Sequence, residues 1–330
     1  MRRAALALAA LVLAALVLAA LVLAAGASPG VQAAEPFGFG VFGDTPYNGF
    51  ERRHLPAVIA EMDAEALAFV IHDGDLKSGG ERCDDALLDA RLATFQTSLH
   101  PFIYVPGDNE WTDCHRSSNG SFDPVERLAR LRQVFFADPR RSLGRYPMAV
   151  DSQADDPAFA AWPENLRWQR GPVLFATINV PGSDNNFGRA GQPGEEFLRR
   201  SEAVRAWIAA AFAQARERQL EGLVLIQHGN PDLEDFSAGR PNRAYRELLL
   251  QLVAEARGFA GEVLLVHGDS HVHRVDQPLA DPSTGTALKN FTRLETIGSP
   301  FMGWVKVDVR PGATPLFRIQ PRFYSPAVSN

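Results

Sequence analysis

The sequence predicts an α/β fold in which helices flank mixed β-sheets. Short apolar runs rich in Val, Ile and Phe alternate with helical stretches along most of the chain, and such runs are typical of buried parallel strands. After His273 the pattern changes, because residues 290–297, 304–310 and 316–320 alternate apolar and polar side chains. That alternation is typical of half-buried antiparallel strands.

The predicted elements follow one another without an internal repeat. We predict strands at 37–42, 67–71, 102–105, 172–180, 223–226 and 263–266, and helices at 53–66, 85–99, 123–136, 195–219 and 244–256. Residues 138–171, rich in Asp, Pro and Trp, are predicted to form an elaborated loop or cap. Its Trp162 and Trp168 either pack onto the core or shape a substrate pocket.

The N-terminus has the order of a targeting segment. Arg2 and Arg3 precede an apolar stretch at 4–25, and Val31-Gln32-Ala33 offers a cleavage site, so residues 1–34 are predicted to be a secretory signal peptide. About 20 apolar residues can also span a bilayer, so a retained N-terminal anchor is the alternative. Residues 35–330 are predicted to form one exported domain, periplasmic or extracellular.

Composition limits the partners of this domain. The chain has 330 residues, a formal net charge of −6 and 9% aromatic residues, which is typical of a globular protein with a sizeable core. It contains no basic stripe that would indicate nucleic-acid binding. A membrane is a predicted partner only if the N-terminal segment is retained, and the oligomeric state stays open.

The two cysteines are predicted to form a disulfide. Cys83 lies eight residues after Asp75, and Cys114 lies six residues after Asp108. An isolated pair in an exported chain is most simply a disulfide, and this one would tie two loops together. The competing interpretation makes one of the cysteines a nucleophile or a metal ligand.

Polar side chains that bind metals follow five of the apolar runs. The carboxyl ends of parallel strands meet at one edge of an α/β sheet, so side chains far apart in sequence are expected to gather there. Carboxylates beside imidazoles suit manganese, iron or zinc. The residues are Asp44; Asp75; Asp108 with Asn109 and Glu110; His228; and His271 with His273.

The order of these motifs resembles that of the calcineurin-like metallophosphoesterases, which include purple acid phosphatases and Ser/Thr protein phosphatases. That family reads Asp-x-His, Gly-Asp, Gly-Asn-His-Asp/Glu, a lone His and Gly-His-x-His. The resemblance implies a layered α/β sandwich and metal-dependent hydrolysis of a small phosphorylated substrate. This chain departs at three positions: Pro46 and Asn109 replace histidines, and Asp108 replaces the metal-binding Asn.

The resemblance also implies which residues hold two metal ions. Asp75 would bridge them, Asp44 and His273 would hold the first, and Asp108, His228 and His271 the second. In an extended segment residues i and i+2 share a face, so both imidazoles of His271-Val272-His273 are expected to face the site. Three Asp carboxylates favour Mn, Mg or ferric iron over an all-imidazole zinc site.

Asn109 cannot serve as a general acid, because an amide does not titrate, although it can donate a hydrogen bond to a phosphoryl oxygen. We predict that His115 replaces it as the acid; the alternative is an ordinary loop histidine. Arg116 is expected to pair with phosphate, and Glu110 to support a ligand from behind. Tyr47 would fill the place of the missing histidine, as a metal ligand or as part of the wall.

Two other interpretations concern function. A structural calcium site is disfavoured because histidines are poor calcium ligands. A degenerate, non-catalytic protein that binds metal or phosphate on the same fold is the alternative to an enzyme. Monoester, diester and pyrophosphate hydrolysis use the same kind of metal core, so the sequence leaves the substrate open.

Overall fold

The computed structural model describes residues 34–188 and 191–326. The described residues from Glu35 onward form one compact unit. The predicted signal peptide lies outside the described residues except for Ala34, so it stays a prediction. Among the helices of the described part, none is long and apolar enough to cross a membrane.

The first sheet has five strands in the order β12-β11-β1-β2-β3. β1, β2 and β3 are parallel, whereas β11 runs antiparallel to β1 and β12 antiparallel to β11. The strands are β1 (Phe37–Phe42), β2 (Leu67–His72), β3 (Phe102–Tyr104), β11 (Gly303–Val309) and β12 (Phe317–Phe323).

The second sheet has seven strands in the order β4-β5-β6-β7-β8-β10-β9. β6, β7, β8 and β10 are parallel, and the edges are antiparallel. The strands are β4 (Asp151–Ser152), β5 (Leu166–Arg170), β6 (Val173–Thr177), β7 (Gly222–Ile226), β8 (Glu262–His267), β9 (Arg274–Asp276) and β10 (Phe291–Glu295).

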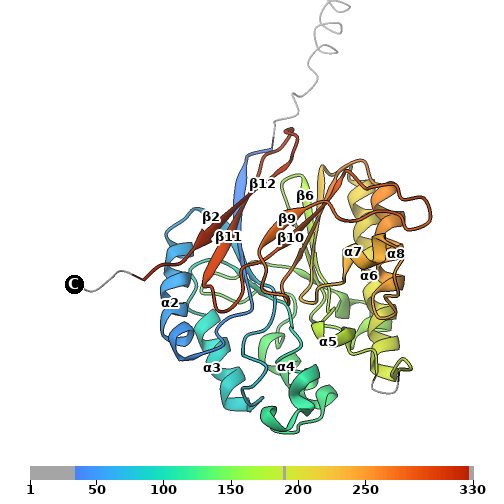
Figure 1. Cartoon of the computed structure of the whole chain (residues 1–330). Helices are drawn as coiled ribbons and strands as arrows, with labels where there is room; N and C mark the ends of the chain where they lie inside the picture. The colour runs from blue at the N-terminus through green and yellow to red at the C-terminus, as the bar shows by residue number, and fades with distance from the viewer. Residues whose placement is uncertain (1–33, 189–190, 327–330) are drawn as a thin grey trace, which may run out of the picture. The chain divides into compact units, whose positions relative to one another are not determined.

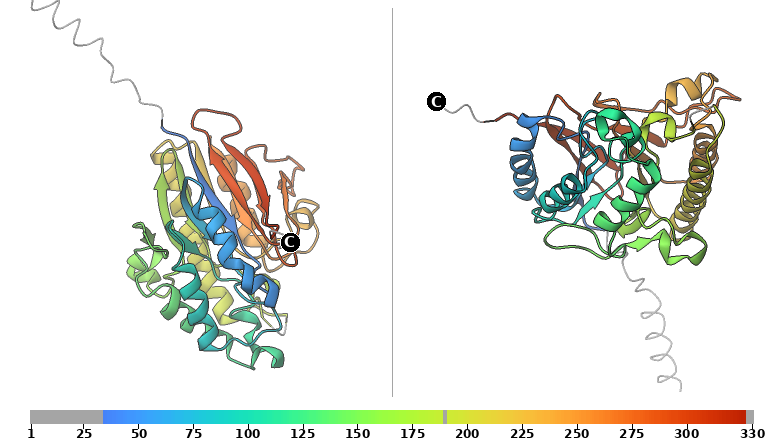
Figure 2. Two further views of the ribbon diagram at one scale, coloured as in Figure 1. Left: turned by 90° about the vertical axis from the view of Figure 1, so that its left-hand side faces the viewer. Right: turned by 90° about the horizontal axis from the view of Figure 1, so that it is seen from below.

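Helices cover the outer faces of both sheets, with α2 and α3 beside the first sheet and α6 and α8 beside the second (Figures 1 and 2). Asn48 caps α2 by accepting hydrogen bonds from two backbone N–H groups, and Asp123 caps α4 ahead of Pro124. The helices are α2 (Gly49–Asp63), α3 (Asp85–Phe95), α4 (Pro124–Phe135), α5 (Gly182–Asn185), α6 (Glu195–Glu217), α7 (Leu233–Ser237) and α8 (Arg246–Arg257).

The alternation of side chains along β6 shows why the layers form. Val173 and Phe175 belong to the core between the two sheets, whereas Leu174 and Ala176 belong to the core beneath α6 and α8. Both faces of this strand are therefore apolar, as expected for a parallel strand buried on both sides. Phe39 of the first sheet meets Phe175 edge-to-face, with ring centroids 5.3 Å apart. The predicted layered α/β sandwich of mixed sheets is confirmed.

Two predictions about local structure need correction. Residues 290–297 were expected to be antiparallel, but β10 pairs in parallel with β8 and antiparallel only with the short β9. The predicted cap at 138–171 contains strands β4 and β5, which extend the second sheet. Trp168 stacks on Phe175 with centroids 5.3 Å apart, so it packs the core.

Candidate metal centre

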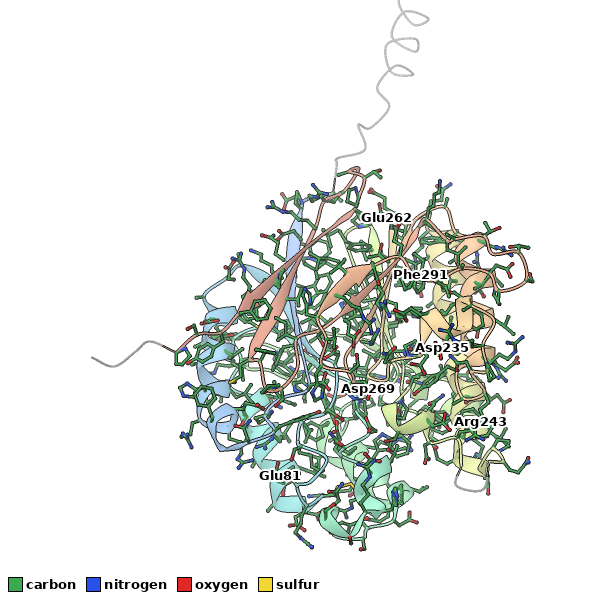
Figure 3. All side chains as sticks on the ribbon, in the orientation of Figure 1. Glu81, Asp235, Arg243, Glu262, Asp269 and Phe291 are labelled. Atoms are coloured by element: carbon green, nitrogen blue, oxygen red, sulfur yellow. A yellow bond between two sulfur atoms is a disulfide. The ribbon has the colours of Figure 1, made fainter. Side chains whose placement is uncertain are left out.

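Loops at the carboxyl ends of five parallel strands meet at one edge of the two sheets. Backbone hydrogen bonds join them: Asp44 N donates to Gly74 O at 3.0 Å, and Gly268 N donates to His228 O at 3.0 Å. The first bond joins the loops after β1 and β2, and the second joins those after β7 and β8. The Asp269 N–H, which donates to Asp44 Oδ2 at 3.1 Å, links the two pairs, as expected at the carboxyl edge of an α/β sheet. Figure 3 shows Asp269, which follows β8, at this edge between the two helical layers.

Four Gly-Asp dipeptides follow strands β1, β2, β3 and β8. Asp44, Asp75 and Asp269 have φ of 49°, 58° and 78°, in the left-handed region that Asp tolerates better than most residues. A Cβ on Gly107 would lie 2.3 Å from Asp75 Oδ1, and one on Gly268 would lie 2.3 Å from Asp44 Oδ2. These tight turns place the carboxylates close together.

The four carboxylates and His228 form two groups that share this imidazole. In the first cluster, Asp44, Asp75 and His228 offer ligand atoms that all lie within 4.8 Å of one another. In the second cluster, Asp108, His228 and Asp269 do the same. His228 Nε2 lies 3.3 Å from Asp75 Oδ1 and 3.1 Å from Asp108 Oδ1.

Hydrogen bonds to backbone carbonyls orient the histidines. His228 Nδ1 donates to Asp73 O at 3.0 Å, and His271 Nδ1 donates to Ser299 O at 2.7 Å. A carbonyl can only accept, so each Nδ1 carries the proton and Nε2 is directed away from it. His271 Nε2 lies 3.3 Å from Asp44 Oδ1. This orientation is the usual arrangement behind a metal-binding imidazole.

Tyr47 and Asn109 both hold the Asp75 carboxylate. The Tyr47 hydroxyl donates to Asp75 Oδ2 at 2.5 Å, and its ring lies edge-on to His271 with centroids 5.2 Å apart. The Asn109 amide donates to Asp75 Oδ2, and its backbone N–H donates to Asp75 Oδ1 at 3.0 Å. Tyr47 therefore lies within the site, in contact with Asp75 and His271.

Glu110 supports the same loops from behind. Its Oε1 accepts from Asp75 N, Gly107 N and the Tyr104 hydroxyl at 3.1, 2.7 and 2.7 Å. The side chain is fully buried, and burial raises its pKa. This carboxylate thus holds the backbone of two site loops and the Tyr104 hydroxyl together.

The protein's own residues compensate the charges of this site poorly. Burial raises the pKa of Asp75 well above its usual range, with Asp108 and Glu110 adding to the effect. Burial would lower the pKa of His228, but Asp75 and Asp108 outweigh it and hold that pKa well above the ordinary value. Burial also raises the pKa of Asp269 to about 6. Crowded carboxylates of this kind are stabilised by bound cations.

The residues present fit a metal centre. Among the described residues, His228 Nε2 and Asp108 Oδ1 are buried and lie 3.1 Å apart, yet neither atom makes a hydrogen bond of acceptable geometry. A buried polar atom in a native protein normally has a partner, and both atoms face the shared space of the second cluster. Carboxylate oxygens with imidazole nitrogens are the donors that transition metals and magnesium take up.

The disulfide joins two loops of this edge. Cys83 and Cys114 are bonded, with Cα atoms 5.8 Å apart, which confirms the predicted pairing. Cys114 lies in a short 3₁₀ helix, Thr112–His115. A disulfide is typical of oxidising compartments, so this bond is compatible with export without establishing it.

The predicted acid and phosphate-binding residues lie at and just after the end of the 3₁₀ helix that carries Cys114. His115 is exposed, and its Nδ1 bonds to Thr112 O at 2.7 Å. Arg116 Nη2 pairs with Asp113 Oδ2 at 2.8 Å. A Cβ on Gly79 would lie 2.9 Å from Asn109 Oδ1 and 3.6 Å from Arg116 Nη1, so the guanidinium adjoins Asn109 at the rim.

His273 is placed apart from the carboxylates. Its Nδ1 bonds to Glu295 O at 2.8 Å, and within the described ranges no carboxylate oxygen is found within 4.0 Å of its ring nitrogens. The expected alternation fails because His271 has a φ of 60°. The segment from His271 to His273 is therefore not an extended strand, and i and i+2 do not share a face.

Two residues of the site were missed in the sequence. Asp269 joins the second cluster, and its signal was the fourth Gly-Asp dipeptide after a strand. Ser183 Oγ lies 2.8 Å from Asp108 Oδ2 and 2.9 Å from Asp113 Oδ1. It begins a run of four left-handed residues, 183–186, a conformation that side-chain pattern alone does not indicate.

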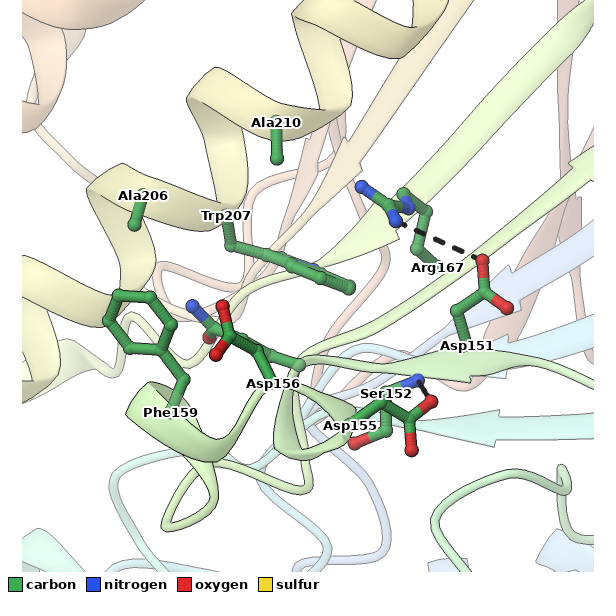
Figure 4. A pocket seen from close by; sticks show the side chains of 10 residues that line it. Asp151, Ser152, Asp155, Asp156, Phe159, Arg167, Ala206, Trp207 and Ala210 are labelled. Atoms are coloured by element: carbon green, nitrogen blue, oxygen red, sulfur yellow. Dashed lines mark hydrogen bonds and ion pairs between the residues drawn. The ribbon is translucent and has the colours of Figure 1, made fainter.

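A separate pocket lies between α6 and the strands β4 and β5 (Figure 4). The Arg167 guanidinium lies 4.3 Å from the Trp207 ring centroid and 3.9 Å from Asp151 Oδ2. This cation already occupies the aromatic face and the carboxylate that would recognise a cationic ligand. None of the clustered metal-binding residues lines this pocket.

Comparison with known proteins gives only a distant likeness. The sequence matches no protein-family model and no curated protein. The fold is similar to 5'-nucleotidase from Candida albicans SC5314 (10% identity, TM-score 0.42), where the alignment covers 87% of this chain and 50% of that one. This chain thus spans about half the length of that nucleotidase.

Two further solved structures are similar at the same level. Phosphopantetheinyl hydrolase from Mycobacterium tuberculosis has 16% identity and a TM-score of 0.33, with 79% of this chain and 89% of that chain covered. Vacuolar protein sorting 29 from Cryptosporidium parvum has 11% identity and a TM-score of 0.32, with 88% and 99% covered. At these scores function has to be inferred from the chain's own residues.

Proposed function

We propose that this protein is a metal-dependent hydrolase of phosphate esters. The observation that supports it most is the convergence of Asp44, Asp75, Asp108, His228 and His271, drawn from five strand ends, on one edge of the sandwich. All but His271 are buried. Burying several carboxylates together is costly without cations, so their convergence is typical of a functional site.

The chain's own residues would hold and shape the reaction site. Asp44 and Asp75 from one sheet, with His228 and His271 from the other, would hold the metal ions. Bound metal ions supply an activated water near neutral pH and a positive field for the phosphoryl oxygens. The Tyr47 hydroxyl and the Asn109 amide keep Asp75 in place. Arg116 at the rim offers a guanidinium to the remaining phosphate charge.

A substrate panel tests this function. The purified chain is assayed with phosphomonoesters, phosphodiesters, nucleotides and pyrophosphate, each with Mn, Mg, Fe, Zn or Ca ions after chelator treatment. We expect turnover of at least one ester class that a chelator abolishes and a returned cation restores. Cation binding without turnover of any ester would instead favour the non-catalytic binding protein, for which Asn109 in place of a histidine is the supporting observation.

We propose His115 as the general acid. It is the exposed imidazole on the loop that Cys114 anchors, and a positioned acid contributes about 10²–10⁴-fold to the rate. Replacing His115 with Asn should slow alkyl phosphates, whose leaving groups need a proton, far more than aryl phosphates. Cation content should stay unchanged. Equal slowing of both substrates, or of neither, would mean that water provides the proton.

Export is proposed from the N-terminal sequence. The basic, apolar and small-residue order of residues 1–34 supports it, and the disulfide is compatible with it. Expression of the whole chain with fractionation of the cells, followed by N-terminal sequencing, separates cleavage near residue 34 from a retained anchor. Protein found only in the cytosol with an intact N-terminus would contradict the proposal.

A further inference from the structure

We propose that Asp269, rather than His271, completes the cation-binding set together with Asp108 and His228, and that this carboxylate shifts the position toward hard, oxygen-preferring ions such as Mn²⁺ or Mg²⁺. The inference rests on the proposed metal dependence. It adds a ligand that the motif order does not contain and names the class of ion for that position.

The placement of Asp269 supports a ligand role. Its Oδ2 accepts a hydrogen bond from Asn230 N at 2.9 Å, which fixes the carboxylate. Its Oδ1 is directed toward the second cluster and lies 4.0 Å from His228 Nε2. The side chain is 27% exposed, so this oxygen borders both the buried cluster and the solvent. One oxygen anchored and one free is a common arrangement for a metal-binding carboxylate.

Gly182 borders the space between the Asp108 and Asp269 carboxylates. A Cβ at this position would lie 2.4 Å from Asp269 Oδ1 and 2.5 Å from Asp108 Oδ1. Both oxygens therefore border the same small space, which any larger residue at Gly182 would fill. Asp108 Oδ1 and His228 Nε2 lie 3.1 Å apart there, buried and without a hydrogen bond of acceptable geometry, so the space has the donor set of a cation site.

The two histidines after Asp269 differ in their surroundings. His271 Nε2 is 3.3 Å from Asp44 Oδ1, which places it with the first cluster. His273 is held by Glu295 O, on the side where the Arg274 guanidinium pairs with Glu295. Relative to the expected set, the contacts move by two residues: His271 takes the place assigned to His273, and Asp269 takes the place assigned to His271.

This exchange changes the chemistry of the position. Two carboxylates and one imidazole replace a set with two imidazoles. Imidazole suits zinc, whereas carboxylate oxygen suits magnesium and manganese. Zinc generally binds nitrogen and oxygen sites more tightly than manganese does, so the expected effect is a smaller zinc advantage rather than its reversal.

Cation titration of the chelator-treated full chain tests the inference. Calorimetry with Mn²⁺ and with Zn²⁺ is performed on the wild type, Asp269→Asn and Asp269→His. We expect Asp269→Asn to weaken Mn²⁺ binding at least ~10-fold, because even supporting residues behind a ligand contribute that much. Asp269→His should raise the ratio of Zn²⁺ to Mn²⁺ affinity by at least ~10-fold.

Two controls match these variants. Asp235→Asn removes the same charge from an exposed residue paired with Arg240 and should leave binding unchanged. His273→Gln should also bind like the wild type. If Asp269→Asn binds as tightly as Asp235→Asn, or if His273→Gln loses an ion, the inference is wrong.

A measurement on the unmodified protein covers the case in which Asp269→Asn does not fold. In chain labelled with ¹⁵N-histidine, addition of Mg²⁺ should shift the side-chain signals of His228 and His271 and leave that of His273 in place. Movement of His273 with His271 unchanged would overturn the inference. Failure of every ester to react would contradict the proposed function alone, because these readouts measure binding.

Discussion

The loops that follow the five-stranded sheet carry Asp44, Asp75 and Asp108, whereas those that follow the seven-stranded sheet carry His228, Asp269 and His271. The first sheet thus provides carboxylates only, and the second provides both imidazoles. The first sheet alone provides no imidazole, and the second alone provides a single carboxylate, Asp269. The site exists because the two sheets present their carboxyl edges side by side, and its chemistry depends on that packing.

We call the loops after the first sheet the carboxylate side and those after the second sheet the imidazole side. The two sides also differ in how their loops are held in place. The carboxylate side is buried, with the disulfide and Glu110 fixing its loops. On the other side, His271 and Asp269 are 31% and 27% exposed and are oriented by hydrogen bonds from or to the backbone. The carboxylate side therefore acts as the rigid base, and the imidazole side borders the solvent from which a cation or substrate would enter.

The largest effect is expected from Asp75, which contacts groups of both sides. Replacing Asp75 with Ala removes the partner of His228, Tyr47 and Asn109 and should abolish cation-dependent hydrolysis and binding of both ions. His271→Ala, on the exposed side, should remove one ion only. Metal analysis of both variants, with Asp235→Ala as a control, measures the difference. Equal losses from the two variants would mean that the sides do not differ in this way.

Removal of the disulfide tests how rigidly the loops of the carboxylate side are held. Cys83 and Cys114 are 31 residues apart, and closing a loop of that length stabilises a protein by about 3–4 kcal/mol. The double change to Ser should lower the free energy of unfolding by about that amount in denaturant titrations. Reduction of the wild type is the matched control, since the chain has only two cysteines. A loss below about 1 kcal/mol would show that other contacts hold these loops.

A smaller effect on the free energy of unfolding is expected from titration of His72, at the end of β2. Burial lowers the pKa of this imidazole to about 4, while Nε2 bonds to Thr45 O at 3.0 Å. The unfolded chain takes up a proton below pH 6.5 and the folded chain does not. Stability is therefore full above pH 6.5 and is lost as the pH falls toward 4, by about 1.4 kcal/mol per pH unit.

The variant His72→Gln lacks this titration. Its deficit in free energy of unfolding relative to the wild type should shrink as the pH is lowered from 6.5 to 4. Denaturant titrations at several pH values measure that slope, and His54→Gln, at a partly exposed histidine on α2, is the control. A difference independent of pH would show that His72 takes up its proton equally in both states.

Most strands and helices could be predicted because their patterns are local. The strand at Phe37–Phe42 has the predicted bounds, and the helix predicted at 195–219 is Glu195–Glu217. Helix α2 begins at Gly49, four residues before the prediction, because Asn48 caps it. The pairing of strands is harder to predict from sequence. β10 pairs in parallel with β8, and the local alternation of side chains does not determine which strand pairs with which.

The sequence predicts where the site lies, but it does not predict which side chains after β8 contact the clusters. Strand ends identify Asp44, Asp75, Asp108 and His228 because they follow regular elements directly. After β8 the chain has no regular structure until β9, and the left-handed conformations of Asp269 and His271 decide which side chain faces the cluster. Such dihedral angles depend on tertiary contacts, which the sequence pattern does not contain: a Cβ on Gly182 would lie 2.4 Å from Asp269 Oδ1, and one on Gly298 would lie 3.0 Å from His271 Cβ.

The central claim is that the two sides together hold cations on which ester hydrolysis depends. The most direct measurement is elemental analysis of the chain purified without chelator, paired with hydrolysis of the best ester during stepwise removal and return of the cations. We predict two bound divalent or trivalent ions per chain, with activity lost and restored in proportion to occupancy. A chain that binds no such ion, or that hydrolyses esters equally well without one, would contradict the account.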